Sequence, residues 1–324
     1  MRILVITSEW PTPEHPEWVP FLVQRVHFLR EAGMEVSVFS FRGRRNPVNY
    51  GRAWFRLRRS HLVAEYDVLD AQFGQSGLLA LPTSKPFVVT FHGSDLQGFV
   101  GQNGRPTRAG WLLQRVSRFI ATRATKVILV SPHLAQYLPA KMPFEVIPCG
   151  LDMSLFRPLS QSQTRQQLGL PQDKKLVLFA ANPANPIKRY ALAKQAVRLL
   201  PASLKAHLVT ISKIPHQQMP LYLNACDVLL LTSQHEGSPT IVKEALACNL
   251  PIVSTDVGDV RQRIGHIPGC VVCSEASPQM LASALTAVLR GEERIAGRSA
   301  VQELDETKLV QKLIGIYEQV AACT

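Results

Sequence analysis

Short runs of branched apolar residues alternate with helix-like segments along most of this chain of 324 residues, and no other feature restricts the fold as strongly. Apolar runs without polar alternation suit the strands of a parallel sheet that is buried on both faces. Strands that alternate with helices predict such a sheet with helices on both sides. The predicted strands are 3–7, 35–40, 68–71, 87–91, 126–130 and 145–147, then 176–181, 206–211, 227–231, 252–255 and 270–273. The predicted helices are 21–32, 190–200, 217–225, 240–248, 278–289 and 306–320.

One polar stretch interrupts this pattern. Residues 152–174 contain Pro158 and Pro171 and no apolar run, which predicts a linker. A chain of this length is also too long for one typical hydrophobic core. We therefore predict an α/β protein with two doubly wound domains and a cleft between them.

The segment from Glu236 to Glu244 carries the first candidate site. The strand predicted at 227–231 ends just before Glu236, and ligands of open α/β sheets bind beyond the carboxyl ends of strands. A helix is predicted to start near Pro239, and the free N–H groups of a helix N-terminus suit a phosphate. Glu236 could thus hold a sugar and Glu244 a ribose diol, with a diphosphate between them. The alternative is that Glu236 lies in a solvated turn and that Glu244 is an exposed residue of the helix. The residues expected to line the diphosphate are Gly237, Ser238, Pro239, Thr240 and Ile241.

Four ordered motifs carry a family resemblance. Besides the two glutamates with seven residues between them, these are Phe-His-Gly-Ser-Asp at 91–95, Ile-Pro-Cys-Gly-Leu-Asp at 147–152 and Leu-Ala-Cys-Asn-Leu-Pro-Ile-Val-Ser at 246–254. Together they resemble the retaining GT-B glycosyltransferases of family 4, also called glycosyl transferases group 1. The resemblance implies two Rossmann-like domains facing across a cleft. It assigns residues 1–155 to the acceptor and 156–305 to a nucleotide sugar, with a last helix at 306–324 that crosses back to the first domain.

The same resemblance implies a reaction and its residues. It implies retaining transfer of a hexose-type sugar from a nucleotide-diphosphate donor, of UDP or GDP type, to a saccharide acceptor. His92, Glu236 and Lys188 are the implied catalytic residues. The family's diphosphate-binding loop normally carries an arginine where this chain has Asn182, and Arg189 either compensates for that loss or faces solvent. Asn182 and Arg189 therefore join Glu244 and residues 237–241 as expected donor-binding residues.

Metal and cofactor sites are not expected. The chain has no Asp-x-Asp pair to clamp a metal on a diphosphate, and the donor is a co-substrate. Cys270 and Cys273 have metal-like spacing but no second pair nearby, and in a strand they would point to opposite faces. The six cysteines are expected to be free thiols of a reduced, cytoplasmic protein. No apolar run is long enough to span a bilayer.

Positive charge is concentrated in the first half of the chain. The formal net charge is +12, and two windows, 36–64 and 96–144, contain arginines and aromatic residues but no acid. A solvated basic face, nucleic-acid binding and docking on an anionic membrane all use such charge. No nucleic-acid-binding motif is recognisable, whereas a lipid-linked acceptor requires docking at a membrane. We therefore expect a peripheral protein of the inner face of the cytoplasmic membrane. The expected acceptor or membrane contacts are Arg56, Arg58, Arg59, Trp111, Arg115 and Arg118.

Three functions remain open at this point. The favoured one is a transferase acting on a lipid-linked acceptor in the synthesis of a cell-surface polysaccharide or glycolipid. A GT-B sugar-nucleotide epimerase would break the same anomeric bond without an acceptor. A noncatalytic binding module is favoured by Asn182, which cannot replace the forked charge of an arginine.

Overall fold

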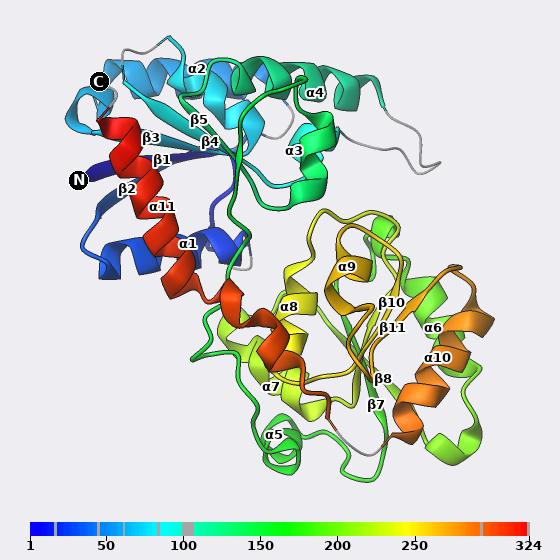
Figure 1. Ribbon diagram of the computed structural model, residues 1–324. Coiled ribbons are helices and arrows are strands. Elements are labelled where there is room, and N and C mark those ends of the chain that lie inside the picture. Colours follow the sequence, from blue (N-terminus) through cyan, green and yellow to red (C-terminus); the bar gives the residue numbers. More distant parts are fainter. Residues whose placement is uncertain are drawn as a thin grey trace. The chain divides into compact units, whose positions relative to one another are not determined.

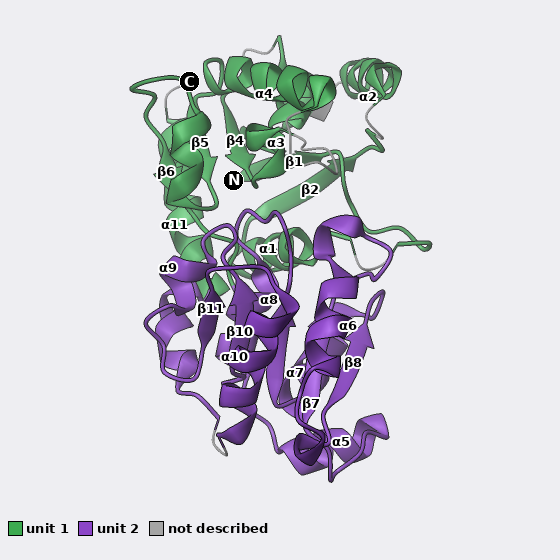
Figure 2. Cartoon of the chain, turned by 90° about the vertical axis from the view of Figure 1, so that its right-hand side faces the viewer, with its two compact units in different colours: residues 1–150, 306–324 green, residues 151–305 purple. Residues whose placement is uncertain are grey.

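The computed structural model describes residues 1–15, 18–43, 46–60, 62–82, 85–98, 107–291 and 294–322. The chain divides into two compact units, residues 1–150 with 306–324 and residues 151–305 (Figure 2). Each unit contains one parallel sheet with helices on both faces, so the prediction of two doubly wound α/β domains is confirmed. Residues 151–155, which the sequence assigned to the first domain, lie in the second unit.

The sheet of unit 1 has six strands in the order β2-β1-β3-β4-β5-β6. Alternate residues of β1 enter two separate cores, because side chains of a strand point to opposite faces. Leu4 packs on the side of α2 and α4, and Val5 on the side of α1 and α11 (Figure 1). The strands are Arg2–Thr7, Glu35–Ser40, Val68–Gln72, Phe87–Phe91, Lys126–Leu129 and Glu145–Val146 (β1–β6). The helices are α1 (Pro20–Glu31), α2 (Pro47–Arg59), α3 (Ser94–Gln97), α4 (Arg108–Ala121) and α11 (Glu306–Ala321).

The last helix, α11, is part of unit 1 although it follows unit 2 in the sequence. Its Leu313 and Tyr317 are buried against the sheet, and the helix lies beside α1 (Figure 1). Arg25 of α1 pairs with Glu306 at 2.8 Å, and both side chains are almost wholly buried. Arg25 also donates to the carbonyl of Pro148. A buried charge needs such partners, and this pair bonds the first residue of α11 to α1.

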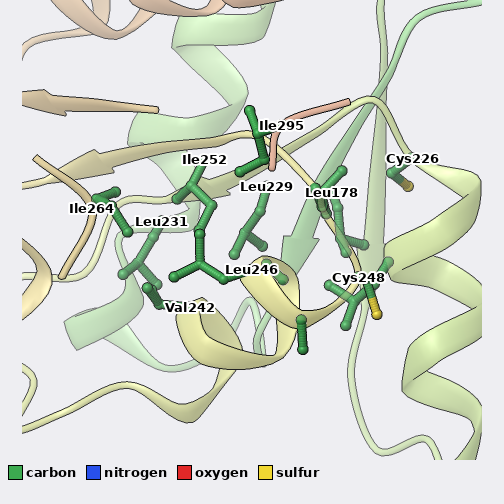
Figure 3. Close-up of a cluster of buried hydrophobic side chains, with 14 of the residues drawn as sticks. Leu178, Cys226, Leu229, Leu231, Val242, Leu246, Cys248, Ile252, Ile264 and Ile295 are labelled. Carbon is green, nitrogen blue, oxygen red and sulfur yellow. The ribbon is translucent and has the colours of Figure 1, made fainter. Parts of the chain in front are cut away.

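The sheet of unit 2 has five strands in the order β11-β10-β9-β7-β8. β8 and β9 lie on opposite sides of β7, and the carboxyl ends of β7 and β9 therefore form the switch point where ligands bind in such sheets. Side chains of β9, β10 and α8 form one core of this unit (Figure 3). The strands are Leu176–Ala180, His207–Ile211, Val228–Leu231, Ile252–Thr255 and Val271–Cys273 (β7–β11). The helices are α5 (Gln161–Leu168), α6 (Tyr190–Arg198), α7 (Met219–Ala225), α8 (Thr240–Ala247), α9 (Val260–Ile264) and α10 (Pro278–Arg290).

The stretch predicted as a linker, 152–174, contains α5 and is packed on unit 2, so that prediction is wrong. Ser160 caps α5, and Gly169 ends it in the left-handed conformation. Arg165, buried within the helix, pairs with Asp227 at 2.7 Å and donates to the carbonyl of Ala225. Arg165 and Asp227 are far apart in the sequence, which is why local composition gave no sign of this contact.

Cys270 and Cys273 face opposite sides of the sheet, as predicted. Cys270 packs against the core that contains β9 and α8, and Cys273 belongs to the core on the opposite face of the sheet. The five cysteines other than Cys323, which lies outside the described residues, are free thiols. Within the described ranges, no group of three or more His, Cys, Asp or Glu side chains is placed to hold a metal ion. The described helices also include none with the length and apolar character needed to cross a bilayer.

Candidate active site

Two loops meet at the switch point of unit 2. One follows β7 and the other follows β9, and the backbone N–H of Gln234 in the second donates to the carbonyl of Ile187 in the first at 2.8 Å. The hydroxyl of Thr232 donates to the carbonyl of Lys188, also at 2.8 Å. Because the parent strands are neighbours in the sheet, these bonds hold the two loops as one rigid edge.

Lys188 and Glu236 form an ion pair on this edge. Lys188 Nζ lies 2.5 Å from Glu236 Oε1, and the two side chains are 28% and 15% exposed. Lys188 and Glu236, both implied as catalytic residues by the family resemblance, are thus direct partners in the structure. An ammonium group has three N–H donors, so bonding to Glu236 leaves capacity for a second anionic partner.

Arg189 is held by backbone carbonyls of the second loop. Its guanidinium donates to the carbonyls of Thr232 and Ser233 at 2.6 and 2.8 Å. Burial lowers the pKa of Arg189. Arg189 thus ties the two loops together, and Lys188 is the cation that the loop presents. Asn182 lies exposed at the start of the loop, where its side chain accepts the N–H of Ala184 in a local turn.

The segment 237–241 leads into the N-terminus of α8. Pro239 occupies the cap position and supplies no side-chain bond, so the first N–H groups of the helix, at Thr240 and Ile241, lack a side-chain cap. The hydroxyl of Ser238 donates to Asp259 at 2.7 Å. Gly258 has a φ of +57°, and a Cβ there would lie 2.4 Å from the carbonyl oxygen of Gly237. The loop after β10 therefore packs directly on this segment and requires glycine at 258.

Glu244 has a partner that the sequence analysis missed. His216, in the loop after β8, lies with its Nε2 2.9 Å from Glu244 Oε1, and Glu244 is buried. Burial lowers the pKa of His216, but the hydrogen bond and charge of Glu244, with a contribution from Asp152, raise it overall. The ring also lies 5.2 Å from that of Phe156. The only available signal was a histidine shortly after the carboxyl end of a strand.

Three further polar atoms around this edge are buried without a hydrogen-bond partner in the described part of the chain. They are Ser233 Oγ, His235 Nε2 and Asp259 Oδ1. Buried polar groups in folded proteins are normally satisfied, and exceptions call for a specific explanation. A polar ligand at this edge would provide one.

His92 of unit 1 follows β4 and is held on several sides. The carboxylate of Asp95 accepts the N–H groups of His92 and Gly93 at 3.0 and 2.8 Å and so caps this loop. Burial raises the pKa of Asp95, and these backbone hydrogen bonds oppose the rise. The imidazole ring lies 4.9 Å from the ring of Phe21 and 4.6 Å from that of Phe73.

The expected membrane contacts lie on α2 and α4 of unit 1. Trp111 and Phe55 are 54% and 59% exposed, and the guanidinium of Arg115 stacks 4.7 Å from the ring of Trp111. Arg56 and Arg58 are partly engaged, because they donate to the carbonyls of Ser40 and Pro82. Arg59 and Arg118 are exposed. Arg44, Arg45 and Arg105, which belong to the same basic windows, lie outside the described residues.

Segments of both units match the models of known protein families. Residues 1–155 match the model of Glycosyltransferase Family 4, and residues 201–300 match that of Glycosyl transferases group 1. The chain belongs to the family 4 glycosyltransferases. The motifs that suggested this family from the sequence alone fall within or beside these two matches.

Known proteins of this family resemble the chain at moderate identity. A teichuronic acid biosynthesis glycosyltransferase of Bacillus subtilis, TuaC, is 29% identical over 245 residues, which cover 68% of this chain and 60% of TuaC. A GDP-mannose-dependent alpha-mannosyltransferase of Mycobacterium tuberculosis is 25% identical over 292 residues, or 82% of this chain and 76% of that protein. The alignment thus spans less than two thirds of TuaC.

Solved structures establish the GT-B fold. Sucrose-phosphate synthase from Thermosynechococcus elongatus has a TM-score of 0.78 at 18% identity, over 100% of this chain and 99% of that one. Anabaena HepE in complex with UDP and glucose has a TM-score of 0.72, also at 18% identity, over 98% of this chain and 100% of that one. At this identity the likeness concerns the fold alone.

Proposed function

We propose that this protein is a retaining glycosyltransferase that moves a hexose-type sugar from a nucleotide-diphosphate donor to a lipid-linked saccharide acceptor, in the synthesis of a cell-surface polysaccharide or glycolipid. The observation that carries the proposal is the Lys188–Glu236 pair at the carboxyl edge of β7 and β9. Beside it, the uncapped start of α8 and the buried Glu244 belong to one helix. A cation, helix amides and two carboxylates are the groups that a nucleotide sugar requires.

The proposed reaction concentrates negative charge on the leaving diphosphate. The bond between the anomeric carbon and the phosphate oxygen breaks, the acceptor oxygen bonds to the same face of the sugar, and the departing phosphate oxygen takes the acceptor's proton. Lys188 and the first amides of α8 stabilise that oxygen, because preorganised donors act where charge develops. Glu236 binds sugar hydroxyls and balances positive charge on the ring. The charge of Lys188 and α8 lets the reaction proceed without a metal.

The relatives support either base in the donor. HepE is described in complex with UDP and glucose, and the mycobacterial relative is named for GDP-mannose. In our proposal Glu244, with one oxygen already held by His216, accepts a ribose hydroxyl common to both nucleotides. His92 contacts the donor sugar near the reacting carbon.

A donor screen tests the transferase directly. UDP-, GDP- and ADP-sugars are incubated with the protein, with and without polyprenyl-linked acceptors and with a metal chelator in parallel. Acceptor-dependent release of the nucleotide, with an unchanged anomeric configuration and no effect of chelation, is expected. Conversion of the donor sugar without any acceptor would instead identify the epimerase. Nucleotide binding without turnover of any donor would identify the binding module that Asn182 favours.

Anionic vesicles should bind unit 1 of this protein. The exposed aromatic and basic side chains of α2 and α4 suit a membrane interface, where a basic residue contributes roughly 1 kcal/mol beside anionic lipid. A variant with five arginines changed to glutamine should therefore sediment with vesicles at least about tenfold less well, since two engaged charges already suffice for that loss. The five are Arg56, Arg58, Arg59, Arg115 and Arg118.

The matched control removes equal charge from exposed positions of unit 2. It changes Lys174, Lys194, Arg198, Lys205 and Arg290 to glutamine. Binding of the control should equal that of the wild type and should weaken as salt shortens the Debye length. Equal losses in the two variants, or no preference for anionic over neutral lipid, would show that these charges form only a solvated basic face.

A further inference from the structure

A chain of buried hydrogen bonds connects the last helix to His92. Tyr317 of α11 donates its hydroxyl to Asp70 Oδ2 at 2.8 Å, and Gln72 Nε2 lies 2.9 and 2.8 Å from the two carboxylate oxygens of Asp70. The Oε1 atom of Gln72 lies 2.8 Å from Nε2 of His92. Tyr317, Asp70 and Gln72 are at most 1% exposed. All four residues belong to unit 1.

These hydrogen bonds cross a core that is mostly apolar and that lies near the buried Arg25–Glu306 pair. Asp70 and Gln72 are two residues apart in β3, so they share one face of the sheet with Val68, and that face is covered by α1 and α11. A polar side chain buried there without a partner would destabilise the fold. The two polar residues are therefore compatible with this core only as members of the chain of bonds.

The chemistry of Asp70 decides how the amide of Gln72 is oriented. An ionised carboxylate only accepts hydrogen bonds, so the amide NH₂ group must face it and the amide oxygen must face His92. Burial raises the pKa of Asp70, and the hydrogen bonds that it accepts from Tyr317 and Gln72 oppose that rise. Burial also raises the pKa of Tyr317, so its hydroxyl keeps the proton that it donates to Asp70.

We propose that Gln72, held by Asp70 and Tyr317, is a positioning residue that fixes the ring orientation and the tautomer of His92. Because the amide oxygen only accepts, Nε2 of His92 carries the proton, and in the neutral ring Nδ1 carries the lone pair. Nδ1 lies 3.9 Å from Cys149 Sγ. The rings of Phe21 and Phe73 and the bond from the backbone to Asp95 limit the other motions of the imidazole.

The consequence for catalysis rests on the proposed function, in which His92 contacts the donor sugar. With the Nε2 proton donated to Gln72, the neutral imidazole offers a sugar hydroxyl one fixed group, the acceptor Nδ1. Loss of that fixed acceptor should affect the bound reaction more than the binding of the nucleotide, because in the proposed function His92 contacts the sugar and Glu244 the ribose. A helix at the end of the chain thus orders a side chain near the reaction.

The test uses ¹⁵N-histidine-labelled full-length protein and two-bond ¹H–¹⁵N correlation spectra, with His92 assigned from a His92→Gln variant. The wild type should show neutral His92 protonated on Nε2 only. Gln72→Met, which keeps the length but removes the acceptor, should show both tautomers and about a tenfold lower kcat at an unchanged KM for the donor. Tyr317→Phe, which removes one of the donors to Asp70, should shift the spectrum in the direction of Gln72→Met.

The control is Thr90→Val. Thr90 Oγ1 lies 3.5 Å from Gln72 Nε2, but Thr90 is not a member of the chain of hydrogen bonds that ends at His92. This variant should leave the spectrum and kcat unchanged. Neutral His92 protonated on Nδ1 in the wild type, or a wild-type spectrum in Gln72→Met, would overturn the proposal. The spectrum does not depend on turnover, so a protein without transferase activity would refute the proposed function and still decide the tautomer.

Discussion

Replacing Lys188 by alanine is expected to lower kcat about 10²–10³-fold, because removal of one preorganised donor to a developing anion typically costs that much. The structure adds a second reason in the same direction. Without Lys188, the side chain of Glu236, only 15% exposed, keeps a charge with no ion-pair partner beside the leaving diphosphate. Steady-state kinetics with the donor identified in the screen measures the effect.

The control for this prediction is Lys194→Ala, which removes an equal charge from an exposed position of α6 in the same unit. It should leave kcat unchanged. A double variant with Glu236→Gln then measures the coupling of the pair, since residues in one ion pair are not additive. Wild-type kcat in Lys188→Ala would show that the diphosphate is bound elsewhere. Arg189→Ala should reduce thermal stability, because Arg189 bonds the carbonyls that join the two loops.

Replacing Glu244 by glutamine is expected to weaken nucleotide binding more than tenfold while affecting the bound reaction much less. Hydrogen bonds to a charged carboxylate contribute roughly 1.5–3 kcal/mol each, and the variant loses that charge for the ribose. It also loses the ion pair with His216, whose pKa is raised by Glu244, so the remaining side chain is less firmly held. Calorimetric titration with UDP and with GDP gives the affinity without turnover.

The matched control is Glu303→Gln, an exposed carboxylate of the same unit. Its affinity for the nucleotide should equal that of the wild type. His216→Gln should weaken binding less than Glu244→Gln, because it removes the support of the carboxylate and not the carboxylate itself. An unchanged affinity of Glu244→Gln for the nucleotide would show that Glu244 does not bind the ribose.

Apolar patterning alone located most elements. The strands predicted at 35–40, 87–91 and 252–255 have the same bounds in the structure. The last two are buried on both faces and are therefore mostly apolar, whereas 35–40 is an edge strand whose apolar residues alternate with polar ones. α5 was missed because its sequence is polar and its position depends on the distant bond of Arg165 to Asp227. α2 and α4 were not predicted either, because their many arginines obscure the apolar side that faces the sheet.

The features of the candidate site also fall into two groups, those that the local sequence predicts and those that depend on the tertiary structure. The sequence by itself determined that Glu236 follows a strand and that Glu244 lies in the helix after it, because each depends on neighbours along the chain. Only the tertiary structure decided that Lys188 pairs with Glu236, that Arg189 turns inward and that His216 supports Glu244. Tyr317 and Asp70, 247 residues apart, show the physical reason. Local pattern fixes the backbone of an element, but the partner of a side chain depends on which elements the fold places beside it.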